Sequence, residues 1–97
     1  MDRWTFLTNH AHVLLCIAAD HGIRLRDAAV KVGVTERAAQ RIVADLLAAG
    51  YLTVEKNGRR NQYEVHPDLP MRHPVEEHAH VGSLLRLLGP RPARKRA

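Results

Sequence analysis

The fold is decided by the stretch LRDAAVKVGVTERAAQRIVADLLAAGYL, residues 25–52. Its apolar residues recur at helical spacing in two blocks, which Gly33 and Thr35 separate. Glycine favours the left-handed end of a helix, and threonine is a good N-cap for the next one. The stretch therefore predicts helices over residues 26–32 and 35–49, joined by a short turn. The apolar positions are Ala28, Ala29 and Val32 in the first helix and Ala39, Ile42, Val43 and Leu46 in the second.

The second helix of this pair has a polar side. At 100° per residue, Arg37, Gln40 and Arg41 lie opposite its apolar face, together with Ala44 and Ala48. The N-terminal half of the helix is thus expected to present polar side chains away from the core.

A β-hairpin is expected over residues 51–66, around Asn57-Gly58, the dipeptide most typical of a type I′ turn. Such a turn pairs Lys56 with Arg59, which sets like charges opposite each other. A bound phosphate would relieve this repulsion, as would side chains that splay into water. The same register assigns one buried face to Leu52, Val54, Tyr63 and Val65.

Before this unit, we expect a helix over residues 9–21, capped by Thr8 or Asn9 and ended by Gly22. Its apolar residues surround the helix axis, so it should pack on two sides. Alternation of apolar and charged residues predicts a short strand over 23–25.

After the hairpin, Pro74 is well placed as the first residue of an amphipathic helix over residues 74–88. The last residues, 91–97, have nothing to bury and are expected to be a disordered basic tail. At 97 residues the chain has the size of one domain, which we assign to residues 1–90. The predicted class is α+β, mainly helical with a small hairpin.

Residues 25–52, continued by the hairpin residues 57–63, resemble the winged helix-turn-helix of MarR-like bacterial transcriptional regulators. The resemblance covers roughly residues 8–66. It implies a winged helix-turn-helix fold whose helix 35–49 enters the major groove of double-stranded DNA. Carried over by position, it nominates Thr35, Arg37, Ala38, Gln40 and Arg41 as DNA-binding residues.

The chemistry of these side chains suits DNA. Arginine can donate two hydrogen bonds to guanine, and glutamine can pair with adenine. Thr35, at the helix start, is better placed for a phosphate. In the hairpin, which corresponds to the wing of this fold, we expect phosphate contacts from Lys56, Arg59 and Arg60.

Charge is distributed as expected for a protein that binds a polyanion. The net charge is +5, and residues 23–66 carry eight basic and five acidic side chains. Residues 91–97 add four basic side chains and no acidic one. This favours a nucleic-acid partner, although a solubilising surface has the same composition.

The apolar excess of the first and last helices predicts a homodimer, because one small core cannot receive it all. The interface residues that we expect are Leu15, Val81, Leu84, Leu85 and Leu88. The chain is shorter than a typical MarR protein, whose longer terminal helices form the dimer and the ligand pocket. This departure from the family pattern argues against small-molecule sensing.

Other classes of function find little support in the sequence. It contains no Gly-rich phosphate loop and no pair of carboxylates suited to a cleft, so we expect neither an enzyme nor a cofactor. The longest apolar run, residues 13–19, is far below the roughly 20 residues that cross a bilayer. One cysteine, Cys16, excludes an internal disulfide framework, and a cytoplasmic location is expected.

Seven histidines raise the question of a metal site. The pairs at helical spacing are His12 with Cys16, His73 with Glu77, and Glu76 with His80. The sequence lacks the Cys-x-Cys pair found in metal sensors of the ArsR type, and we expect no metal ligand. An ArsR-like repressor and a winged-helix module that binds another protein remain the alternatives to a sequence-specific DNA-binding regulator.

Overall fold

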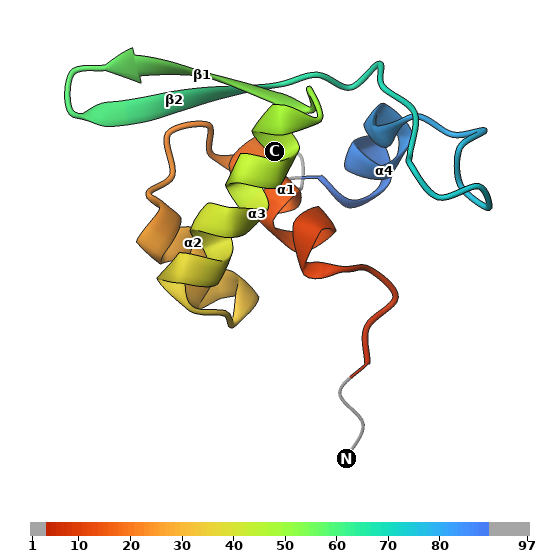
Figure 1. Ribbon diagram of the computed structural model, residues 1–97, viewed down its shortest axis with the longest axis horizontal. Helices are drawn as coiled ribbons and strands as arrows, with labels where there is room; N and C mark the ends of the chain where they lie inside the picture. Colours follow the sequence, from red (N-terminus) through yellow and green to blue (C-terminus); the bar gives the residue numbers. More distant parts are fainter. Residues whose placement is uncertain (1–3, 90–97) are drawn as a thin grey trace, which may run out of the picture.

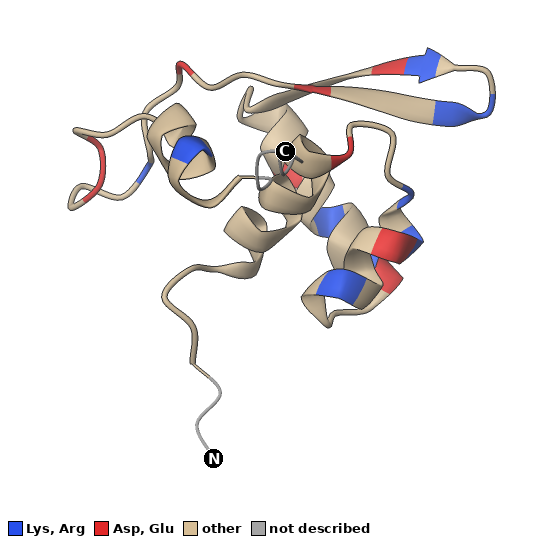
Figure 2. Ribbon diagram, turned by 180° about the vertical axis from the view of Figure 1, so that it is seen from behind, with Lys and Arg blue, Asp and Glu red and all other residues tan. Residues whose placement is uncertain are grey.

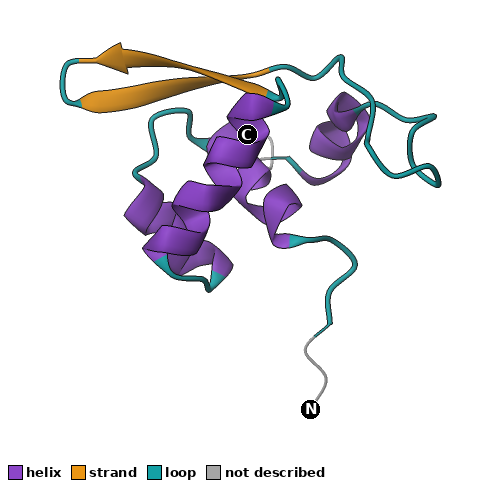
Figure 3. Cartoon of the chain, viewed as in Figure 1, coloured by secondary structure: helices purple, strands orange, loops and turns teal. Residues whose placement is uncertain are grey.

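The computed structural model describes residues 4–89. This part of the chain forms four helices and one two-stranded antiparallel sheet, which confirms the α+β class (Figure 1, Figure 3). The predicted disordered tail, 91–97, lies outside the described residues. The elements are α1 (Asn9–Ala19), α2 (Leu25–Val32), α3 (Glu36–Ala48), β1 (Leu52–Asn57), β2 (Arg60–Val65) and α4 (Val81–Leu88).

The predicted turn between α2 and α3 is confirmed. Gly33 adopts the left-handed conformation, with φ of 89°, and its N–H donates to the carbonyl oxygen of Ala29. The Thr35 hydroxyl then accepts a 3.0 Å hydrogen bond from the N–H of Ala38, as an N-cap does. These local bonds end α2 and start α3 within one residue of the expected positions.

Helix α1 is the central helix, in contact with α2, α3, β2 and α4, and this confirms its two-sided packing. Thr8 is its N-cap, but the helix ends at Ala19, so the expected end at Gly22 is wrong. Asp20 adopts an extended backbone, and its carboxylate accepts a hydrogen bond from the Gly22 N–H. Gly22 keeps a negative φ, because this Asp20 turn already reverses the chain.

The strand expected over residues 23–25 is not formed. Leu25 is the first residue of α2, and the two residues before it are irregular. One backbone hydrogen bond, from the Tyr63 N–H to the His21 carbonyl, joins this segment to β2. The alternating pattern instead reflects the burial of Ile23 in the core.

The hairpin has a register two residues away from the predicted one. Asn57 pairs with Arg60 and Lys56 with Asn61, so the predicted opposition of Lys56 and Arg59 is wrong. A type I′ turn needs positive φ at both central residues. Here Gly58 alone has positive φ, and the two-residue loop is therefore Gly58 and Arg59.

A shift of two residues keeps every side chain on its predicted face, because side chains alternate with a period of two. Leu52 accordingly lies opposite Val65, and Val54 opposite Tyr63. Leu52 and Tyr63 are buried, whereas Val54 is 44% exposed. Val54 and Tyr63 stand at the same level of the hairpin, but Tyr63 lies on β2, which contacts α1 and is joined to His21 by a backbone hydrogen bond.

The last helix, α4, is shorter than expected, since it begins at Val81 and not at Pro74. The segment before it instead returns alongside residues 69–71. The Met71 N–H donates to the Ala79 carbonyl, and the Val81 N–H donates to the Leu69 carbonyl. These two bonds hold residues 79–81 extended, so a helix cannot pass through them.

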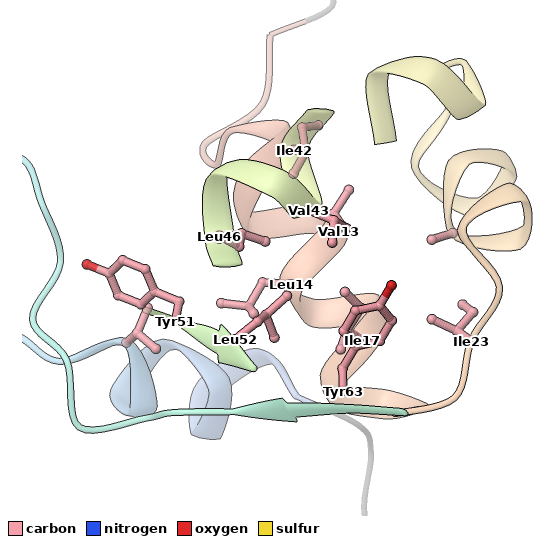
Figure 4. Packing of buried hydrophobic residues seen from close by; sticks show 12 residues of the cluster. Val13, Leu14, Ile17, Ile23, Ile42, Val43, Leu46, Tyr51, Leu52 and Tyr63 are labelled. Atoms are coloured by element: carbon pink, nitrogen blue, oxygen red, sulfur yellow. The ribbon is translucent and has the colours of Figure 1, made fainter. Parts of the chain in front are cut away.

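The core lies where α1, α3 and the base of the hairpin meet (Figure 4). Its completely or almost completely buried side chains include Val13, Ile17 and Leu52. Both tyrosines, Tyr51 and Tyr63, are buried as well, and the Tyr51 hydroxyl donates to the carbonyl oxygen of Pro70. None of the helices in residues 4–89 has the length and apolar character needed to cross a membrane.

Candidate nucleic-acid interface

The outer side of α3 is polar and free of packing. Arg37, Gln40 and Arg41 are exposed, whereas Ala38 is half-buried. Thr35 is exposed too, although its hydroxyl is engaged in capping the helix. This orientation is set by the opposite side, where Ala39, Ile42, Val43 and Leu46 are buried in the core.

A polar cleft of about 320 Å³ lies between the closed end of the hairpin and the starts of α2 and α3. Five basic side chains line it, together with one carboxylate, that of Glu36. Figure 2 shows Lys and Arg positions at the closed end of the hairpin and across from it, at the start of α2. The basic residues of the cleft are Arg24, Arg26, Lys56, Arg59 and Arg60.

The positive charge of the cleft is little neutralised by the protein itself. Among residues 4–89, no Lys or Arg nitrogen lies within 4.0 Å of a carboxylate oxygen, and the one contact of a His ring with a carboxylate, His10 with Asp45, lies elsewhere. The guanidinium of Arg60 donates to the carbonyl oxygen of Gly22, and this contact holds the hairpin against the segment before α2. Like charges gathered in a concave site attract an anion from solution.

Arg24, Arg26 and Glu36 also belong to this site, although no sequence pattern predicted them as members. Arg24 and Arg26 line the cleft because the segment before α2 runs beside β2, where His21 and Tyr63 are hydrogen-bonded. The excess of basic residues over 23–66 was a signal for them, but spacing along the chain could not place them beside the hairpin.

The expected dimer residues are not all on the surface. Val81 is buried in the core of its own chain, so it has no exposed side chain to offer a partner. Leu15, Leu84 and Leu85 are half-buried, and Leu88 is 48% exposed.

The histidine pairs do not combine into a metal site. Within the described part of the chain, no group of three or more His, Cys, Asp or Glu side chains could hold a metal ion. Glu76 and His80 precede α4, as do His73 and Glu77, so neither pair shares a helix face. The His12 ring instead lies 3.1 Å from the Asn9 side-chain oxygen.

Cys16 is half-buried on α1 and packs against the core. Burial raises the pKa of its thiol, and the nearby positive charge of Lys31 opposes this in part. A raised pKa keeps the thiol protonated, which is typical of a structural cysteine.

Neither a protein-family model nor a curated protein matches the chain.

Proposed function

We propose that residues 8–66 form a winged helix-turn-helix domain that binds double-stranded DNA and reads its sequence, as a transcriptional regulator does. In this proposal α2, the turn and α3 are the helix-turn-helix, and the hairpin is the wing. The observation that carries it is an exposed polar side of α3 beside a cleft of five basic residues. Helix-turn-helix proteins use this arrangement of a base-reading helix and flanking phosphate contacts.

Base reading would fall to α3. Its diameter fits the major groove, where each base pair presents its own pattern of donors and acceptors. Arg37 and Arg41 suit guanine, and Gln40 suits adenine. Since the core fixes the rotation of α3, these three side chains would enter the groove together.

Affinity would come mainly from the cleft. Lys56 and Arg59 on the hairpin face Arg24 and Arg26 across it, so a sugar-phosphate backbone between them would be held from two sides. Phosphate contacts of this kind orient a protein on the duplex without reading its sequence.

The proposal is tested by selecting preferred duplexes from a random library and comparing them with random duplexes in a fluorescence anisotropy titration. Arg37→Ala or Gln40→Ala should weaken binding to the selected duplex by about 1–3 kcal/mol, roughly 5- to 150-fold. Binding to random duplexes should change little. Arg86→Ala, which removes one exposed charge from α4, is the control.

Selection that enriches no sequence would refute sequence-specific binding. Equal losses on selected and random duplexes would show that α3 contacts only the backbone.

A further inference from the structure

The N-terminal arm, residues 4–7, carries two aromatic side chains that face water. Trp4 is 68% exposed and Phe6 is 91% exposed. Their rings are packed edge to face, with centroids 5.0 Å apart. Both tyrosines of the chain are buried in the core, so the single tryptophan and the single phenylalanine stand out as unburied aromatics.

An apolar cavity of about 220 Å³ opens beside α1, between α3 and α4. A closed apolar cavity of about 150 Å³ is large enough to bind benzene, so this one has room for an aromatic ring. Polar side chains at the cavity include His10, Arg72 and Glu76. The apolar lining includes Leu14, Leu46, Tyr51, Met71, Val81 and Leu84.

The arm does not fill the cavity of its own chain. Phe6 and Leu7 lie at the cavity, yet the Phe6 ring is almost wholly exposed. The direction of the chain is set by Thr8, which caps α1 through the Ala11 N–H, and by the Thr5 hydroxyl, which donates to the Leu7 carbonyl. With these contacts in place the arm leads away from the helices (Figure 1).

We propose that two copies of the chain exchange their arms, so that the Phe6 ring of each copy enters the cavity of the other and its Trp4 ring covers the opening. A twofold axis makes the exchange reciprocal, so that each arm is covered by the partner and each cavity is filled. The exchange buries Leu84, one of the expected dimer residues, beneath the partner's arm.

The surface area that this exchange would bury supports a stable dimer. A fully covered aromatic side chain buries about 150–250 Å², so two Phe6 side chains and half of each Trp4 side chain bury about 450–750 Å². The surfaces that they cover lose a comparable area, which brings the total to about 900–1,500 Å². The upper half of this range lies within that of stable protein–protein interfaces, which begins at about 1,200 Å².

The exchange leaves the proposed DNA interface free. The cavity and the basic cleft have no lining residue in common. Dimer formation is therefore measured without DNA, and its result does not depend on the proposed function.

Trp4 is the only tryptophan, so its fluorescence reports on the arm alone. The full chain is diluted from about 100 to 0.1 μM, a range that brackets a micromolar Kd, and tryptophan emission and sedimentation are recorded. We expect a dimer with blue-shifted emission at high concentration and a monomer with water-exposed emission at low concentration.

Phe6→Ala should raise the Kd of the dimer by about 30-fold or more, since central aromatic residues dominate interfaces. It cannot damage the core, because the Phe6 ring is exposed in the monomer. Val30→Ala, at an apolar residue that is 78% exposed on α2, should leave the Kd unchanged.

Three outcomes would overturn the exchange. A monomer with water-exposed emission at every concentration shows that the arm finds no partner. A monomer with blue-shifted emission shows that the arm folds into its own cavity. A dimer in which Trp4 stays exposed, or in which Phe6→Ala has no effect, uses a different interface.

Discussion

Replacing both Arg24 and Arg26 with alanine should make DNA binding less sensitive to salt. Both residues line the basic cleft, and neither has a carboxylate partner within 4.0 Å among the described residues. Each phosphate contact contributes about 0.9 to the slope of log affinity against log salt. The double variant should therefore have a slope shallower by about 1.8. Between about 50 and 200 mM salt, the unmodified protein then loses roughly 12-fold more affinity than the variant.

The measurement is anisotropy of a labelled random duplex over this salt range. A matched control, Lys31→Ala with Arg86→Ala, removes the same charge from exposed positions that do not line the cleft. Its slope should stay that of the unmodified protein. Arg24 and Arg26 are exposed, so the free energy of unfolding should change by less than about 0.5 kcal/mol in the double variant.

Two results would refute the reasoning. An unchanged slope in the double variant means that the cleft holds no phosphate. An equal change in the control means that total charge, and not the cleft, governs binding.

Other predictions concern the fold. Leu52→Ala should lower the free energy of unfolding by about 2–5 kcal/mol in urea titrations, whereas Val54→Ala, on the same face but outside the core, should cost far less. Equal losses would contradict the difference in burial between Leu52 and Val54. Tyr51→Phe removes the hydrogen bond to Pro70 and should cost about 1 kcal/mol; no loss would mean that water replaces it. Cys16 should react with iodoacetamide more slowly than a free cysteine at pH 8, because burial raises its pKa and leaves less thiolate. Its rate should still be rising where that of a free cysteine levels off, and a rate equal to that of free cysteine would contradict this burial.

The elements that could be predicted from sequence are those made by contacts close along the chain. The Gly33 turn, the Thr35 cap and the apolar stripe of α3 depend on residues within a few positions of one another. The polar face with Arg37 and Gln40 follows from the same periodicity. Its exposure could therefore be predicted before the tertiary structure was known.

Contacts between distant residues decided the rest. Helix α4 begins at Val81 because residues 79–81 are hydrogen-bonded to the segment that starts at Leu69. The observed hairpin register differs from the predicted one by two residues because, of Asn57 and Gly58, only Gly58 adopts positive φ. Either register buries the same face, so the apolar pattern could not distinguish them.

The basic cleft depends on tertiary structure in the same way. Arg24 and Arg59 are far apart in sequence, and both line the cleft because a backbone hydrogen bond joins His21 to Tyr63. Periodicity describes the faces of a single element, so it determined which side chains of α3 are exposed. It carries no information about which other elements lie beside that face, and packing around α1 decided that.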